Sequence, residues 1–217
     1  MKLSLPALIV AAAAATLSLP AAAHDAPMAK AAEPAVIATK LADARAAQRD
    51  LWIGHVFWVR NVVLATFEGD REAATAAEAQ VVTNAKAIAA SIEPFYGKPA
   101  SEQLFKLLAG HWGAIKADLD AAHAGDKAGR DAAMAKLLAN AEEIAKFLSG
   151  ANPNLPHDTV KGLLVAHGSH HVQQISEVKA RQFDAEAKTW AAMSTHMYVI
   201  ADALADGIAK QFPDKFR

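Results

Sequence analysis

The chain contains no cysteine, so disulfide bridges, thiolate metal sites and cysteine nucleophiles are excluded. Its formal net charge is −1, and this balance gives no basic surface for nucleic acid or for an anionic membrane. It also lacks alternating strand patterns, a Gly-rich phosphate loop, a nucleophile elbow and a zinc-protease motif. Hydrophobic residues make up 53% of the 217 positions, with Ala dominant, so a sizeable helical core is expected.

Residues 1–23 have the pattern of a bacterial secretory signal peptide: a short basic start, an apolar run and a small-residue cleavage site ending at Ala23. We expect residues 24–35 to form a flexible linker and residues 36–217 to form a single domain. Export would place the mature protein in the periplasm or outside the cell, without stable membrane insertion after cleavage. Cleavage after Ala23 would also leave His24 at the N-terminus, where an α-amine and an imidazole can chelate copper.

A period of 56 residues runs through the rest of the chain without gaps. A fixed period indicates one supersecondary unit used three times. The recurring polar residues are unusual because they lie among aliphatic positions. Three sets show the period: His55, His111 and His167; Asn84, Asn140 and His196; and Leu51, Leu107 and Leu163.

Each unit has the helical spacing of an αα-hairpin. In the first unit we expect helices over 36–68 and 72–92, separated by the pair Gly69–Asp70. The second unit repeats this turn at Gly125–Asp126, whereas the third has Arg181–Gln182 there and should turn differently. The predicted fold is therefore all-α, a six-helix bundle made of three repeated hairpins.

Capping signals predict where the later units begin. Ser101 follows Pro99 and is a typical N-cap for the second unit. Asp158 has the same role in the prediction for the third unit. The sequence therefore predicts helices that begin directly after these two residues.

The geometry of a hairpin predicts a polar layer. His55 and Asn84 are equally far in sequence from the turn at Gly69–Asp70. Because a helix rises about 1.5 Å per residue, both should lie at one height, roughly 21 Å from the turn. Such a layer is tolerable in an aliphatic core only if its groups satisfy one another, a water or a ligand.

The sequence leaves two interpretations of this layer open. In the structural one, each His pairs with the Asn of its own hairpin and fixes helix register. In the other, the layer is a transition-metal site for zinc or copper, because neutral imidazole is the commonest metal ligand. The proposed ligands are His55, His111, His167 and His196, with His171 as a further ligand; Asn84 and Asn140 would orient the imidazoles.

How the three hairpins pack decides whether the histidines can share a ligand. Hairpins around a common axis bring the histidines together, whereas a linear array keeps them apart. A pocket for a small polar ligand and a bis-His haem between facing helices are also conceivable. His171 lies four residues after His167, on the same helical face, and His170 points to a different face.

Three segments, His55–Asn61, Asn84–Ala85 and Pro94–Gly97, resemble a family of uncharacterised bacterial helical proteins with the pattern HVxWxRN…NA…PFYG…LLxxH…ANA. The resemblance implies an all-helical repeat protein with His at three matching places, and it implies no activity. This chain departs from that pattern in two places: Gly54 stands where an acid is expected, and Val59 where Thr is usual.

The sequence therefore predicts an exported, periplasmic, non-enzymatic binding protein whose ligand is a transition metal ion or a small polar molecule. The alternative is a structural or interaction protein of the envelope. No motif favours an enzyme, and none identifies a protein partner.

Overall fold

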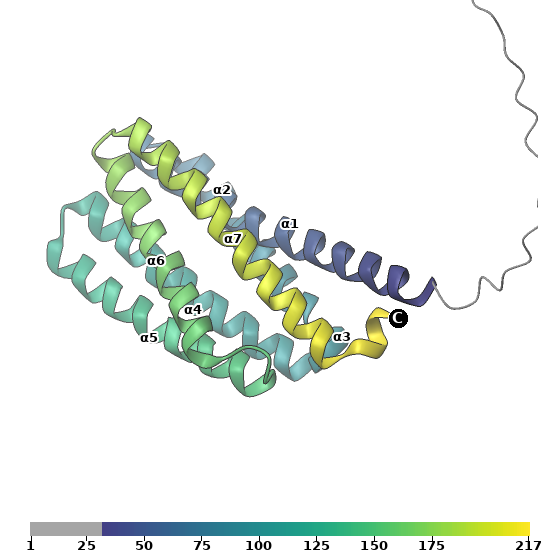
Figure 1. Ribbon diagram of the computed structural model, residues 1–217. Coiled ribbons are helices and arrows are strands. Elements are labelled where there is room, and N and C mark those ends of the chain that lie inside the picture. Colours follow the sequence, from purple (N-terminus) through teal and green to yellow (C-terminus); the bar gives the residue numbers. More distant parts are fainter. Residues whose placement is uncertain (1–31) are drawn as a thin grey trace, which may run out of the picture.

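The computed structural model describes the backbone of residues 32–217 and the side chains from residue 39 onward. This part of the chain is all-α, as predicted, with six long helices packed as antiparallel neighbours and two short ones (Figure 1). The elements are α1 Ala32–Glu68, α2 Arg71–Ser91, α3 Glu93–Tyr96, α4 Lys98–Ala124, α5 Lys127–Ala151, α6 His157–Lys179, α7 Phe183–Gln211 and the 3-10 helix η1 Pro213–Phe216.

The predicted signal peptide, residues 1–23, lies outside the described residues, as does most of the predicted linker over 24–35. Helix α1 begins at Ala32, inside that linker. None of the helices in the described part of the chain combines the length and the hydropathy needed to cross a membrane.

Two of the hairpin turns use the predicted Gly–Asp pair. Gly69 and Gly125 have φ values of 77° and 75°, the left-handed region that ends a helix at low cost only for glycine. The next residue then caps the following helix: the Asp70 side chain accepts from the Ala73 amide, and Asp126 accepts from the Gly129 amide. The third turn differs, as expected, because Arg181 with φ 56° makes it.

The two predicted N-caps are wrong. Helix α4 begins at Lys98 after Gly97, with proline in its first turn, and Ser101 is a buried residue inside it. Proline is accepted there because the first helical amides need no partner in the helix. Helix α6 begins at His157 after Pro156, so Asp158 lies within its first turn.

The six long helices form a closed ring. In the order α1, α2, α4, α5, α6 and α7, each helix contacts the next, and α7 returns to contact α1. Helices α1, α4 and α6 also contact one another across the middle of the ring. The hairpins therefore surround a common axis, and a linear array is excluded. The C-terminal helix η1 lies beside the start of α1 (Figure 1).

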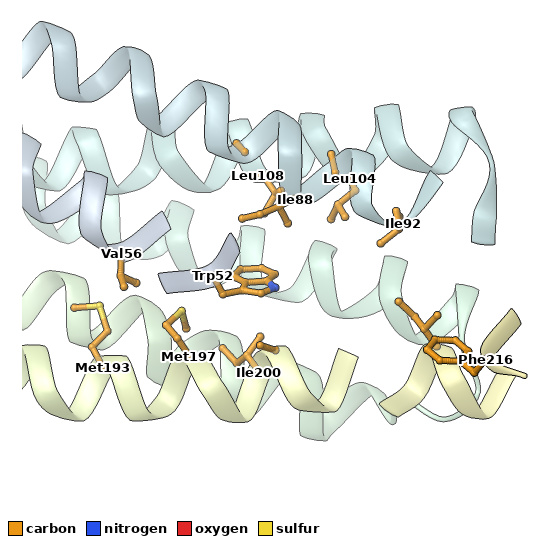
Figure 2. Close-up of a cluster of buried hydrophobic side chains, with 14 residues drawn as sticks. Trp52, Val56, Ile88, Ile92, Leu104, Leu108, Met193, Met197, Ile200 and Phe216 are labelled. Carbon is orange, nitrogen blue, oxygen red and sulfur yellow. The ribbon is translucent and has the colours of Figure 1, made fainter. Parts of the chain in front are cut away.

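The core fills this ring with aliphatic and aromatic side chains on both sides of the histidine level. On the side of α3 and η1, Trp52 lies between Ile88 of α2 and Ile200 of α7 (Figure 2). On the other side, Trp112 and Ile115 pack with valines of α1. Burying such side chains stabilises the fold by about 1.5–3 kcal/mol each, so the polar layer sits in a well-packed apolar frame.

Candidate metal centre

Four histidines meet at the centre of the bundle. His55 comes from α1, His111 from α4, and His167 and His171 from α6. One ligand nitrogen of each lies within 4.8 Å of those of the other three. Their exposed fractions are 6%, 3%, 1% and 0%, in the same order. Because α1, α4 and α6 are the three helices that meet across the ring, the packing itself brings these side chains together.

The imidazole rings contact one another directly. His55, His111 and His167 have ring centroids 5.3–6.2 Å apart. His171 is one helical turn beyond His167 on α6, and their Nε2 atoms are 3.2 Å apart. A tetrahedral ion with bonds of about 2.0 Å holds its ligand nitrogens about 3.3 Å apart. This pair therefore already has the spacing of one edge of a metal site.

Burial keeps all four imidazoles neutral. It lowers the pKa of His55 to about 3, with a smaller contribution from His111. It lowers the pKa of His111 to about 4, although the hydrogen bond to Asn140 acts in the opposite direction. It also holds the pKa of His167 and His171 well below the ordinary value, helped by the neighbouring imidazoles. Neutral imidazole is the form that binds a metal.

Hydrogen bonding fixes which nitrogen of His111 faces the group. The Asn140 amide nitrogen donates to the Leu107 carbonyl at 3.0 Å, which identifies its Oδ1 as the atom 3.2 Å from His111 Nδ1. His111 Nδ1 must therefore donate, so Nε2 of the neutral ring carries the lone pair. A hydrogen bond of this kind at the far nitrogen is typical of metal-bound histidines.

Four ring nitrogens in the group have no hydrogen-bond partner within the described residues. They are Nε2 of His55 and of His111 and Nδ1 of His167 and of His171, all buried. Buried polar atoms nearly always find a partner, and an exception calls for an explanation such as an ion. A metal ion at the centre of the group would give Nε2 of His55 and of His111 a partner.

His196, predicted as a fourth ligand, is not in this group. Its Nε2 bonds to the Leu163 carbonyl at 2.8 Å. Asn84 and Asn140 make the equivalent hydrogen bonds, to the carbonyls of Leu51 and Leu107. In each hairpin, therefore, the side chain in the second helix bonds to the carbonyl of the leucine 33 residues before it. His171 completes the group of four instead.

The two asparagines differ in what they do. Asn140 contacts His111, as predicted for a residue that orients an imidazole. Asn84 makes no such hydrogen bond to His55, the histidine of its own hairpin. Its Oδ1 is buried and has no partner in the described part of the chain. The predicted pairing of each His with the Asn of its own hairpin is therefore seen in one hairpin, that of α4 and α5.

The position of the two amides explains why glycine stands at positions 54 and 110. A Cβ atom on Gly54 would lie 3.0 Å from Asn84 Nδ2, and one on Gly110 would lie 3.1 Å from Asn140 Nδ2. Both distances are shorter than ordinary van der Waals contact. A side chain at either glycine would therefore push the amide nitrogen and strain its hydrogen bond to the leucine carbonyl.

The bundle has no room for a haem at this level. The cavity next to the imidazoles has a volume of about 50 Å³, only a third of the roughly 150 Å³ apolar cavity that holds a single benzene. A porphyrin is several times larger than benzene. The bis-His haem that the sequence left open does not fit this cavity.

Sequence reasoning missed a polar cluster in which Glu186 and Gln174 are buried. The Arg60 guanidinium makes two hydrogen bonds to Glu186, at 2.6 and 2.7 Å, and Gln174 of α6 donates to the same carboxylate. The hydrogen bond from Arg60 holds the pKa of Glu186 below its ordinary value. The one signal in the sequence is Arg60 in the motif that follows His55.

Comparisons of this chain with family models, with curated proteins and with solved structures give no match.

Proposed function

We propose that this protein binds one transition metal ion, zinc or copper, through His55, His111, His167 and His171. The observation that carries the proposal is the convergence of four buried imidazole nitrogens within 4.8 Å. Four aromatic nitrogen donors in a dry core are expensive to bury unless they share a ligand. Coordination to one ion would give these nitrogens a shared partner and offset the cost of burying them.

The donor set favours zinc and copper. The group consists of imidazoles, without a carboxylate or a thiolate, so it lacks the oxygen ligands that Mg²⁺ and Ca²⁺ prefer. Imidazole suits zinc and copper among the common ions. No acidic ligand compensates the charge of the ion, and copper(I), with a single charge, would meet the smaller desolvation cost.

The geometry supports a preformed site. His167 and His171 already have the separation of two ligands on one tetrahedral ion. The other two donors need to move inward by about 1 Å, because tetrahedral ligands lie about 3.3 Å apart. Side-chain rotation within the cluster can supply a movement of that size.

We further propose that the domain arose from three copies of one helix pair and that residues 1–23 direct its export to the periplasm. Support for the first comes from three hydrogen bonds that follow the 56-residue spacing, from Asn84, Asn140 and His196 to the corresponding leucine carbonyls. Support for the second comes from the sequence pattern of the first 23 residues. The protein would then act as a metal-binding protein outside the cytoplasm.

Metal titration of the untagged chain tests the function. We expect one zinc ion to bind per chain, and His111→Ala to weaken the affinity at least about tenfold, the range found when a metal site loses part of its support. Free zinc at about 100 times the Kd adds about 2.7 kcal/mol of stability, which for a chain of this size raises Tm by about 5–10 °C. Calorimetry and thermal unfolding measure both effects.

His123→Ala is the matched control, because His123 is on the same helix as His111 and is exposed. It should leave the zinc affinity unchanged. For copper the titration is repeated with His24→Ala, so that chelation at a processed N-terminus is recognised. Affinity in the millimolar range for the parent chain, together with a large loss of Tm in His111→Ala, would show that the histidines only fix helix register.

A further inference from the structure

A second feature of the core lies directly against the four histidines. A cavity of about 50 Å³ runs along the bundle axis on the side of α3 and η1, and three of the four imidazoles form one end of it. All six long helices contribute to its wall. The three imidazoles are His55, His111 and His167, whereas His171 is not among the lining residues.

The wall of the cavity carries no charged residue. Trp52, Ile88, Leu108 and Ile200 line it together with other apolar side chains; Figure 2 shows these four residues in the buried cluster. Its further polar residues, Gln48 and Ser91, are engaged elsewhere. These two bond to each other at 3.0 Å, Gln48 also accepts from the Trp52 indole, and Ser91 donates to the Ile88 carbonyl.

This chemistry selects the occupant. An anion in the cavity would find no cation or free hydrogen-bond donor in its wall, and burying an unpaired charge costs many kcal/mol. A water needs two to four polar partners; the wall offers free ones only at the end formed by the imidazoles, where the proposed ion would take Nε2 of His55 and of His111, and the rest of the wall is apolar. The volume is enough for a molecule of two or three heavy atoms, because benzene needs roughly 150 Å³. A small uncharged molecule is therefore the ligand that fits.

We propose that this cavity is a binding site for a small uncharged molecule, of the class of carbon monoxide, nitric oxide and dioxygen, and delivers it to the open face of the four-His group. Its coordination to an ion there rests on the proposed metal-binding function. The ion would face the cavity between His55, His111 and His167, with His171 behind it. A metal site that takes such a ligand keeps three protein ligands and an open fourth position, so His171 would leave the copper(I) ion and His55, His111 and His167 would hold it.

Two measurements test the proposal separately from metal binding. In the metal-free protein, xenon is the probe, because dry apolar cavities bind it. We expect xenon to shift the NMR signals of the lining methyl groups, such as those of Ile88 and Leu108, in a saturable way. In the copper(I)-loaded protein, carbon monoxide is the probe. We expect one CO molecule to bind per copper ion and to give a single infrared band.

Ala203→Leu fills the cavity, because Ala203 lines it. We expect this variant to weaken xenon and carbon monoxide binding at least about tenfold. Ala191→Leu is the control, since it makes the same change at an exposed position of α7. If Ala203→Leu does not fold, Leu164→Ala enlarges the same cavity and should increase xenon uptake.

The outcomes are distinct. No saturable xenon shift in the parent chain, or an equal shift in Ala203→Leu, would overturn the cavity as a ligand site. Xenon binding without any copper binding would contradict the metal proposal and leave a gas-binding cavity that delivers to no ion. Copper binding without a CO band would show that the ion does not face the cavity, which also overturns the inference.

Discussion

As the pH falls below about 6.5, the metal-free protein should lose stability with a slope that approaches about 5 kcal/mol per pH unit near pH 5. An unfolded His takes up a proton near pH 6.5. Burial lowers the pKa of His111 to about 4 and that of His55 to about 3, and it holds the pKa of His167 and His171 well below the ordinary value. Near pH 5 the unfolded chain therefore binds nearly four more protons than the folded chain.

Because the unfolded chain binds more protons, the free energy of unfolding decreases as the pH falls. Groups whose pKa is lowered by folding and whose neutral form is buried stabilise the fold above the pKa of the unfolded state, and this contribution is lost as the pH falls. Each proton accounts for about 1.4 kcal/mol per pH unit, and a typical domain has only about 5–15 kcal/mol of stability in total. Acid unfolding should thus be complete well above the pH at which His111 is protonated in the folded state.

Denaturant unfolding at a series of pH values, followed by circular dichroism, measures this slope. His171→Leu removes one of the four protons and should lower the slope by about a quarter. Leu119→Ala is the control, because it removes a fully buried aliphatic group and destabilises by about 2–5 kcal/mol without changing proton uptake. Stability that stays constant between pH 7 and pH 5 would mean that the four imidazoles are not buried in their neutral form.

Arg60→Met should destabilise the protein by about 3 kcal/mol. Arg60 and Glu186 join α1 to α7, and the side chain of Glu186 is only 2% exposed. Removing the guanidinium leaves a buried carboxylate with Gln174 as its remaining partner, and an uncompensated buried charge is costly. We expect the low end of the usual range because Arg60 itself is one third exposed.

The same two helices provide the control. Arg49 makes a similar two-bond pair with Asp202, but Asp202 is 29% exposed where Glu186 is 2% exposed, so Arg49→Met should cost less than about 1 kcal/mol. The double variant Arg60→Met with Glu186→Met should recover more than half of the loss, because the unpaired charge is then absent. Equal losses in Arg60→Met and Arg49→Met would show that burial does not strengthen the pair.

Much of the fold could be predicted because it depends on local patterns. The Gly–Asp turns at Gly69 and Gly125 were visible in the sequence, since left-handed backbone and side-chain capping are local requirements. Ser101 and Asp158 were assigned as caps from the same rules, and both were wrong because a proline in or just before the first turn allowed the helix to begin earlier. Residue type alone does not reveal at which of two neighbouring positions a helix begins.

The candidate site was only partly predictable, for a three-dimensional reason. The 56-residue spacing singled out His55, His111 and His167, and helical periodicity added His171. Sequence could not decide whether His196 or His171 completes the group, because this depends on how α1, α4 and α6 meet across the bundle. The cavity beside the imidazoles likewise depends on packing that involves all six helices.

X-ray absorption of the one-to-one zinc complex is the most direct test of the metal centre. The account predicts four nitrogen ligands at about 2.0 Å, with the outer-shell scattering that imidazole rings produce. It also predicts that His171→Leu loses one imidazole from this shell. A shell of oxygen ligands with scattering from at most one imidazole would contradict the account, because the ion would then be bound somewhere other than among the four buried histidines.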